Sequence, residues 1–301
     1  MAIEAVRTPD DRFEDLPDYT FAPNYIDTLA GYEGLRVHFL DEGPADADRT
    51  FLCLHGQPSW SFLYRKMIPV FVESGARVIC PDWLGFGRSD KPVQDDLYTF
   101  HFHRNMMLEF VKALDLKNVT LVCQDWGGIL GLTLPMDLPD RFERLLVMNT
   151  AIAVGQTPGQ GFEAWRAYNR TQPDMDIAAL MKRGTSILSD AEAAAYAAPF
   201  PDVTYKAGVR RFPELVMTDP GMEGVETSKR AAQWWRHDWQ GESFMAVGAQ
   251  DPVLGPSQME NLRDTIANCP APMMIEDGGH FVQEWGAPIA RAALQRWGDL
   301  S

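Results

Sequence analysis

Asp125 stands where a strand-like segment gives way to a helix-like one. Residues 120–123 are apolar strand formers, and the apolar positions after Gly127 have helical spacing. Cys123 and Gly127 flank Asp125 at a distance of two residues, which is the spacing of a nucleophile elbow. A carboxylate there is ionised near neutral pH and can displace a leaving group from a saturated carbon. The stretch thus predicts an Asp nucleophile that forms an alkyl ester, although its local pattern alone is more typical of a helix N-cap.

An ester on Asp125 would need a base for its hydrolysis, and that base would need an orienting partner. Asp251 lies just past one expected strand and His280 just past the next. The chain order is therefore nucleophile, acid, histidine, and loops at the carboxyl ends of parallel strands meet in one crevice. Separately, Asp251 before a proline is more typical of a turn, and His280 after two glycines of a helix start. Together with the elbow, the three residues predict a catalytic triad.

Backbone N–H groups complete the predicted site. In elbow folds the oxyanion hole uses the N–H after the nucleophile, which is that of Trp126 here. A second N–H comes from the loop after an earlier strand, and Gln57 is the candidate. We interpret the neighbouring His55 as structural.

Short apolar runs and helical segments alternate along most of the chain. The runs expected to be strands are residues 50–54, 77–80, 120–123, 144–150, 243–247 and 272–275. The helices expected with them are residues 62–74, 99–114, 227–239, 256–266 and 288–297. An antiparallel hairpin is expected within residues 21–41. This alternation predicts an α/β fold with a mostly parallel central sheet flanked by helices.

The rhythm changes between residues 151 and 225. This segment has no good strand run, and glycines and prolines separate short helical patches. It is expected to be an inserted helical cap over the carboxyl edge of the sheet. The predicted organisation is a core domain of residues 1–150 and 226–301 with a cap subdomain of residues 151–225.

Composition limits the possible partners. The chain has 301 residues, and its net charge of −15 argues against nucleic acid or an anionic membrane surface. Neither a signal peptide nor a membrane-spanning segment is recognisable, so we expect a cytoplasmic protein. The four cysteines lack a metal-type spacing and are expected to be free, mostly buried thiols. Oligomeric state cannot be inferred from these features.

Six motifs, in chain order and covering nearly the whole sequence, carry a family resemblance. They are HGQPSWSFLYRKM, PDWLGFGRSDKP, CQDWGG, APFPD, GAQDPVLG and GGHFVQE. The chain resembles the α/β-hydrolases of the haloalkane dehalogenase family, and in particular its first subfamily, which has an Asp, His, Asp triad. The resemblance implies that Trp126 donates its indole N–H to the departing halide.

A second halide-binding tryptophan is expected from the cap. Some family members carry it in a segment where this chain has Gly184, and others where it has Trp165. We favour Trp165, with packing in the cap core as the alternative interpretation. The chain also departs from the subfamily at Gln57, which is commonly Glu there. Gln57 removes a like charge near Asp125 while leaving the backbone donor unchanged.

The resemblance implies hydrolysis of a haloalkane to alcohol, halide and proton, with no metal or organic cofactor. An epoxide hydrolase has the same fold and an Asp nucleophile but needs an acid on the cap, for which Tyr168, Tyr196 and Tyr205 are available. Trp126 next to the nucleophile argues against that alternative. A non-catalytic binding protein on the same scaffold is the alternative from another class, and the complete triad argues against it.

Overall fold

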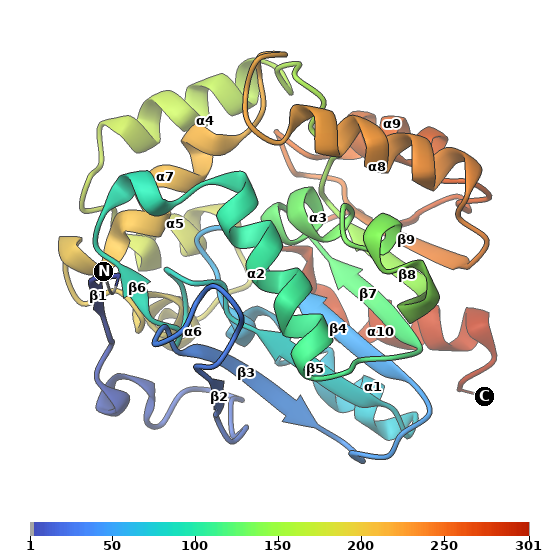
Figure 1. Ribbon diagram of the computed structural model, residues 1–301, viewed down its shortest axis with the longest axis horizontal. Helices are drawn as coiled ribbons and strands as arrows, with labels where there is room; N and C mark the ends of the chain where they lie inside the picture. The colour runs from blue at the N-terminus through green and yellow to red at the C-terminus, as the bar shows by residue number, and fades with distance from the viewer. Residues whose placement is uncertain (1–2, 301) are drawn as a thin grey trace.

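A twisted eight-stranded sheet forms the centre of the molecule (Figure 1). The computed structural model describes residues 3–300. The strand order in this sheet is β10-β9-β8-β7-β4-β5-β3-β2, and β1 and β6 form a small second sheet. The strands are β1 Ala5–Val6, β2 Asn24–Ile26, β3 Val37–Glu42, β4 Thr50–Leu54, β5 Arg77–Pro81, β6 Lys91–Pro92, β7 Val119–Cys123, β8 Phe142–Met148, β9 Glu242–Gly248 and β10 Met273–Ile275.

Strand directions agree with the predicted fold. The strands from β10 to β5 run parallel to one another, whereas β3 and β2 pair antiparallel. The β2–β3 pair is the hairpin expected within residues 21–41. Strands β4 and β7 are entirely buried because helices cover both faces of the sheet, which explains their uninterrupted apolar sequences.

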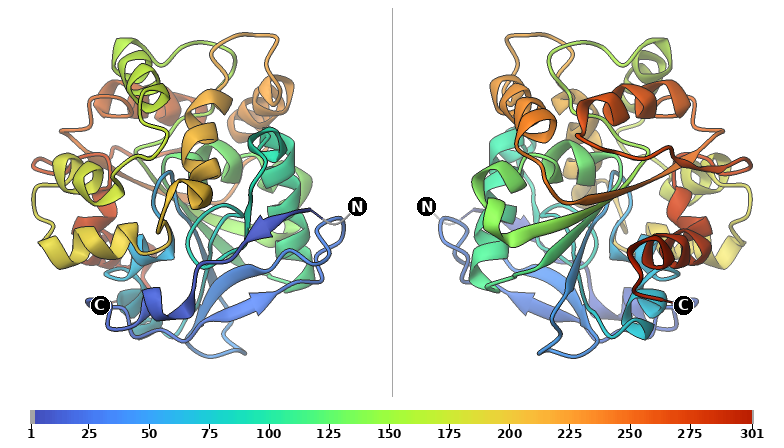
Figure 2. Two further views of the ribbon diagram at one scale, coloured as in Figure 1. Left: turned by 90° about the vertical axis from the view of Figure 1, so that its left-hand side faces the viewer. Right: turned by 90° about the vertical axis from the view of Figure 1, so that its right-hand side faces the viewer.

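Helices lie on both faces of the sheet (Figure 2). Helices α1 and α10 pack together on one face, and α2, α3 and α8 cover the other. The helices outside the insert are α1 Ile68–Glu73, α2 Phe100–Ala113, α3 Trp126–Gly131, α8 Val225–His237, α9 Pro256–Thr265 and α10 Gly286–Trp297. Helix α2 matches the expected segment, and the side chain of Thr99 caps its N-terminus.

The prediction of a single helix over residues 62–74 is wrong. The chain instead forms a short 3-10 helix, Ser61–Tyr64, and then α1. Proline suits the first turn of a helix because it has no N–H to donate, and Pro69 sits there at the second position of α1. The other helix and strand ends differ from expectation by about two residues, within the usual uncertainty of boundaries.

Residues 151–224 contain helices and no strand. The α-helices here are α4 Gln160–Arg170, α5 Ile177–Gly184, α6 Asp190–Ala197 and α7 Ala207–Leu215. They lie beside the sheet on the left of Figure 1, with α4 at the top and α6 lowest. Helix α7 packs on α4, and α5 packs on α6.

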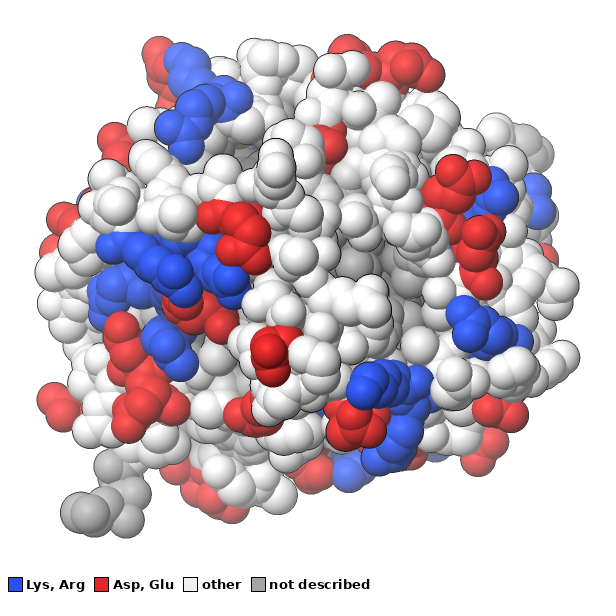
Figure 3. Space-filling model, turned by 90° about the horizontal axis from the view of Figure 1, so that it is seen from above, with Lys and Arg blue, Asp and Glu red and all other residues white. Residues whose placement is uncertain are grey.

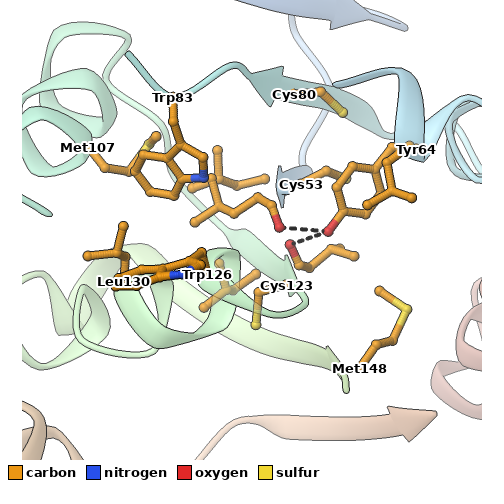
Figure 4. Packing of buried hydrophobic residues seen from close by; sticks show 14 of the residues in the cluster. Cys53, Tyr64, Cys80, Trp83, Met107, Cys123, Trp126, Leu130 and Met148 are labelled. Atoms are coloured by element: carbon orange, nitrogen blue, oxygen red, sulfur yellow. Dashed lines mark hydrogen bonds between the residues drawn. The ribbon is translucent and has the colours of Figure 1, made fainter. Parts of the chain in front are cut away.

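Buried thiols and aromatic rings fill the space around the central strands (Figure 4). All four cysteines are free; Cys53, Cys80 and Cys123 are buried and Cys269 is half-buried, as expected. The hydroxyl of Tyr64 donates a hydrogen bond of 2.8 Å to the carbonyl oxygen of Leu54 in β4, so this ring connects the 3-10 helix Ser61–Tyr64 to the sheet.

Charged side chains gather mainly toward the edges of the face drawn in Figure 3, and uncharged ones occupy much of its middle. This is the side of the molecule on which α4, α8 and α9 lie. Within residues 3–300, no helix has both the length and the apolar character needed to cross a membrane.

Candidate active site

The backbone at Asp125 adopts a conformation that is rare for residues other than glycine. Its φ is +49° and its ψ is −124°, between the end of β7 and the start of α3. The N–H of Asp125 donates to the carbonyl oxygen of Asn149 at 2.9 Å, and the Thr150 hydroxyl donates to the carbonyl oxygen of Asp125 at 2.7 Å. The turn is therefore held by the residues that follow the neighbouring strand β8.

Close packing under the turn requires small residues. A Cβ atom on Gly127 would lie 1.9 Å from the carbonyl oxygen of Leu54, and one on Gly56 would lie 2.4 Å from Oδ2 of Asp125. No side chain fits at either distance. Glycine is thus required at position 127 by the approach of α3 to the end of β4, and at position 56 by the approach of the loop after β4 to Asp125.

The carboxylate of Asp125 does not cap α3, although Asp125 occupies the N-cap position. It instead accepts a hydrogen bond of 2.8 Å from the backbone N–H of Gln57, and the N–H of Trp126 also favours its ionised form. Burial raises the pKa of Asp125, against the opposing effects of His280 and these two N–H groups. The N-cap interpretation therefore does not account for the position of this side chain.

Asp251 uses its two oxygens for different purposes. Oδ1 accepts from the N–H groups of Val253 and Leu254 and holds the turn after β9, while Oδ2 accepts from Nδ1 of His280 at 2.8 Å. The side-chain amide of Asn149 also donates to Oδ2, at 3.0 Å. Burial favours the neutral acid, but the imidazole and the N–H donors outweigh it and lower the pKa of Asp251 to about 2.

His280 lies between the two carboxylates. Its Nδ1 faces Asp251, and its Nε2 lies 3.8 Å from Oδ1 of Asp125. Burial disfavours the charged imidazole, but Asp251 and then Asp125 outweigh this effect and raise the pKa of His280 to about 9. The following 3-10 helix begins at Val282, so His280 is not a helix-start residue. The three residues predicted as a triad thus lie within direct reach of one another.

Three residues beside the triad had not been singled out from sequence. Asn149 and Thr150 directly follow β8, and the rule that strand ends meet at one edge could have identified them. Gln124, whose amide nitrogen lies 3.1 Å from Nε2 of His280, had no such signal. His55 was interpreted as structural, and its buried ring accepts from the N–H of Trp83 and contacts the carbonyl oxygen of Gly56.

A cavity of about 1200 Å³ opens in front of Asp125. Its walls include the predicted halide donors Trp126 and Trp165, and also Trp285, which had not been singled out. Within residues 3–300, the indole N–H groups of these three tryptophans donate to no protein acceptor, whereas that of the buried Trp60 donates to a backbone carbonyl. Gly184, the alternative position for a cap tryptophan, also lines the cavity. Free indole N–H groups beside Asp125 suit a small, weakly hydrated ligand.

Metal-type clusters are absent from the part of the chain that the structure describes. Within residues 3–300, no three His, Cys, Asp or Glu side chains are grouped so that they could hold a metal ion.

The fold and the site define a hydrolase of the α/β class. Its mostly parallel sheet carries an elbow with a carboxylate, and this carboxylate faces a cavity lined by tryptophans. The family model described as alpha/beta hydrolase fold matches residues 49–287. The haloalkane dehalogenase of Psychrobacter cryohalolentis is 44% identical over 97% of this chain and 98% of its own length. That of Mycolicibacterium paratuberculosis is 39% identical over 98% of each chain. The chain belongs to the haloalkane dehalogenase family.

Solved structures agree with this assignment. The haloalkane dehalogenase DpaA from Paraglaciecola agarilytica NO2, described as tetrameric, is 50% identical and superimposes with a TM-score of 0.96, over 97% of this chain and 98% of its own. A haloalkane dehalogenase from Bradyrhizobium elkani, at 22% identity and a TM-score of 0.74, shares the fold.

Proposed function

We propose that this protein hydrolyses haloalkanes to an alcohol, a halide ion and a proton through a covalent ester on Asp125. The observation that carries the mechanism is the buried carboxylate at the elbow. It faces a cavity that also contains tryptophan N–H groups without protein acceptors. A hydroxyl at this position would suit acyl transfer, whereas a carboxylate suits displacement at a saturated carbon.

In the first step, Asp125 attacks the carbon that carries the halogen. The carbon–halogen bond breaks, its electron pair leaves with the halide, and a carbon–oxygen bond to Asp125 forms. Trp126, which is only 3% exposed, would donate its N–H to the leaving halide, with Trp165 as the second donor. Donors in a dry pocket stabilise a developing anion more than water does, because they need no reorganisation.

In the second step, water attacks the carbonyl carbon of the ester. His280 accepts the proton of this water, and Asp251 holds the imidazole through Nδ1. The N–H groups of Gln57 and Trp126, which favour the ionised carboxylate in the resting enzyme, would stabilise the oxyanion. The bond to the alkoxide oxygen then breaks, that oxygen takes the proton from His280, and the resulting Asp125 carboxylic acid releases its proton to restore the carboxylate.

Ester formation also prepares His280 as a base. The negative charge of Asp125 is one of the effects that raise the pKa of His280. Because the ester is uncharged, that effect disappears when the first step is complete. The pKa of His280 then falls, and the imidazole can accept a proton in the step that needs it.

The positions of the tyrosines in residues 151–225, away from the cavity walls, argue against a role for them as acids in epoxide opening. Among the described residues that line the cavity there is no tyrosine. Tyr196 is fully buried and donates its hydroxyl to Glu284, while Tyr168 is 39% exposed. We accordingly favour carbon–halogen hydrolysis over epoxide hydrolysis, with a small haloalkane as substrate.

We further propose that residues 151–225 act as a cap on a core of residues 1–150 and 226–301. The cavity supports this division because its walls combine the elbow with side chains of α4 and α5, such as Trp165 and Leu180. On this proposal the insert provides much of the wall that contacts the substrate.

The test is halide release from a short bromoalkane, followed as bromide and as acidification. The native enzyme should release both, and Asp125→Ala should release neither while remaining folded by circular dichroism. One turnover in heavy-oxygen water should place the label in the Asp125 carboxylate, because water attacks the ester carbonyl. Label that appeared first in the alcohol would show direct attack of water on the substrate and would refute the ester.

A further inference from the structure

Gln124 connects the nucleophile segment to the histidine. It immediately precedes Asp125, and its side chain is fully buried. Its amide nitrogen lies 3.0 Å from the main-chain oxygen of His280 and 3.1 Å from Nε2 of the same residue. The mechanism proposed above assigns no role to this side chain.

The surrounding hydrogen bonds determine which way the Gln124 amide points. The main-chain oxygen of His280 can only accept, so it requires the NH₂ group of Gln124 on that side. On the other side, the amide nitrogen of Gln283 lies 3.4 Å from Oε1 of Gln124. Since Tyr64 donates its own proton to the carbonyl oxygen of Leu54, the hydroxyl oxygen of Tyr64 is free to accept from the amide of Gln283, at 3.5 Å.

An amide oriented in this way is compatible with only one form of the imidazole. A donor at 3.1 Å from Nε2 requires a lone pair there, so the proton must be on Nδ1, where Asp251 accepts it. That form is the neutral base required for ester hydrolysis. The charged groups that face the ring, Asp251 from the loop after β9 and Asp125 from the elbow, favour the protonated imidazole instead.

The main-chain contact of Gln124 has a second effect. His280 follows two glycines in the loop after β10, where the backbone has few conformational restrictions. Gln124 binds the carbonyl of that residue, and it is covalently next to Asp125. A single residue, Gln124, thereby fixes the position of His280 relative to Asp125.

We propose that Gln124 is a positioning residue for the second step: its amide holds His280 next to the Asp125 ester with Nε2 unprotonated. This inference rests on the proposed function. It predicts that Gln124 matters for ester hydrolysis and not for displacement of the halide, since an ionised carboxylate attacks without proton transfer.

The test compares Gln124→Met and Gln124→Glu with the native enzyme. Methionine has a similar volume but no donor, and glutamate keeps the shape but adds a carboxyl group. In rapid-quench experiments with a short bromoalkane, the first bromide should leave within about threefold of the native rate. Hydrolysis of the ester should slow roughly tenfold or more, and the alkyl adduct should accumulate in intact-mass spectra.

The pH profile separates positioning from a merely structural role. Without the amide donor the pKa of His280 should rise, so the acid limb of ester hydrolysis should move to higher pH by roughly half a unit to one unit in Gln124→Met. It should move further in Gln124→Glu, because another acidic group favours the imidazolium. If both steps slowed equally and the acid limb stayed in place, Gln124 would be a packing residue and the inference would be wrong.

Two further measurements distinguish failure of this inference from failure of a variant to fold and from failure of the proposed function. If neither variant folds, nitrogen NMR of the native enzyme with labelled histidine decides: the inference requires Nε2 of neutral His280 as a hydrogen-bonded acceptor, and a proton on Nε2 refutes it. If the native enzyme gave no bromide and no adduct, the proposed function itself would fail. Native turnover with unaffected hydrolysis in the Gln124 variants would refute the role of Gln124 alone.

Discussion

Asp125 and His280 each influence the protonation of the other. The ionised Asp125 raises the pKa of His280, while His280 lowers that of Asp125 against the effect of burial. In the resting site the carboxylates therefore favour the charged imidazole, against the amide donor of Gln124, while His280 favours the ionised Asp125 that the proposed first step needs. On the proposed mechanism, the ester removes one of these carboxylate charges and so favours the neutral base.

Replacement of His280 by glutamine should separate the two steps. Displacement of the halide needs no base, so His280→Gln should release about one bromide per active site in a burst and then stop. The alkyl group should remain on Asp125 as an added mass on the intact protein. A variant that showed neither a burst nor an adduct would mean that His280 activates water against the substrate itself.

Halide binding provides a test for the cap tryptophan. Because a free indole N–H in the cavity is the proposed donor, Trp165→Phe should weaken bromide binding, by about tenfold if one good hydrogen bond to an anion is lost. Bromide quenching of tryptophan fluorescence measures this affinity. Trp285→Phe is the matched control, since Trp285 also lines the cavity but lies in the 3-10 helix Val282–Trp285 after His280. Weaker binding in the control alone would assign the second donor to Trp285.

At the level of single elements, the elbow depends on how closely its helix approaches β4. The first turn of α3 lies against the end of β4, where Gly127 meets the carbonyl oxygen of Leu54. A backbone oxygen cannot rotate away as a flexible side chain can. The strand and the helix would have to separate to admit even one methyl group.

Gly127→Ala should therefore destabilise the protein by roughly 3 kcal/mol or more, or prevent folding. Gly184→Ala is the control, because a Cβ there would meet only a ring carbon of Phe281 at 3.9 Å. As an alanine in helix α5, it should be neutral or stabilise by up to about 1 kcal/mol. Urea unfolding measures both variants, and equal midpoints would contradict the tight packing described at the elbow.

The helices within residues 151–225 contact the rest of the chain through a buried charged cluster and through hydrogen bonds at several places. The guanidinium of Arg65 pairs with Glu192 of α6 at 2.6 Å and with Glu284 at 2.7 Å. The side-chain amide of Gln57 donates a hydrogen bond to the carbonyl oxygen of Val209 in helix α7. Gln57, whose N–H contacts Asp125, thus also contacts α7, so this helix is linked to the site.

At the scale of the whole molecule, buried histidines link stability to pH. His103 lies in α2, and its two ring nitrogens are 3.1 and 3.0 Å from the carbonyl oxygens of Thr99 and Leu84. Both contacts favour the charged ring, but burial outweighs them and lowers the pKa of His103 to about 4. An unfolded histidine titrates near 6.5, so between about pH 6.5 and 4 the unfolded chain binds a proton that the folded one does not. Stability should fall on acidification through this window, by about 3 kcal/mol from this residue.

His103→Gln should remove that contribution, because glutamine does not titrate and can still donate to the carbonyl of Leu84. The variant is expected to be less stable at neutral pH, yet its unfolding free energy should depend less steeply on pH between 6.5 and 4, by up to about 1.4 kcal/mol per unit. Urea unfolding at several pH values measures the slope. Parallel curves for the two proteins would show that His103 titrates alike in both states. The raised pKa of His280 affects stability in a different pH range. Its contribution to the unfolding free energy is fully present below about pH 6.5 and is lost as the pH rises toward 9.

The sequence alone was sufficient to predict the succession of the main strands and helices along the chain, the mostly parallel sheet and the position of Asp125 at an elbow. These features depend on apolar periodicity and on small residues at fixed spacing, which are local properties of the chain. Residues 50–54 were predicted as a strand and form β4 with the same bounds, because an apolar run between turns has few alternatives. Asp125, Asp251 and His280 were predicted to lie together because each follows a predicted strand, and the structure places them side by side.

Tertiary structure alone decided the contacts that complete the site. Gln124 and His280 lie 156 residues apart, and nothing in their local sequences indicates that one amide contacts the other's ring and carbonyl. The hydrogen bond from Asn149 to Asp251 also depends on β8 lying between β7 and β9. The break in the helix expected over residues 62–74 likewise reflects packing of a buried segment against the sheet. Such contacts depend on strand order and on the shapes of facing surfaces, which arise only when the whole chain has folded.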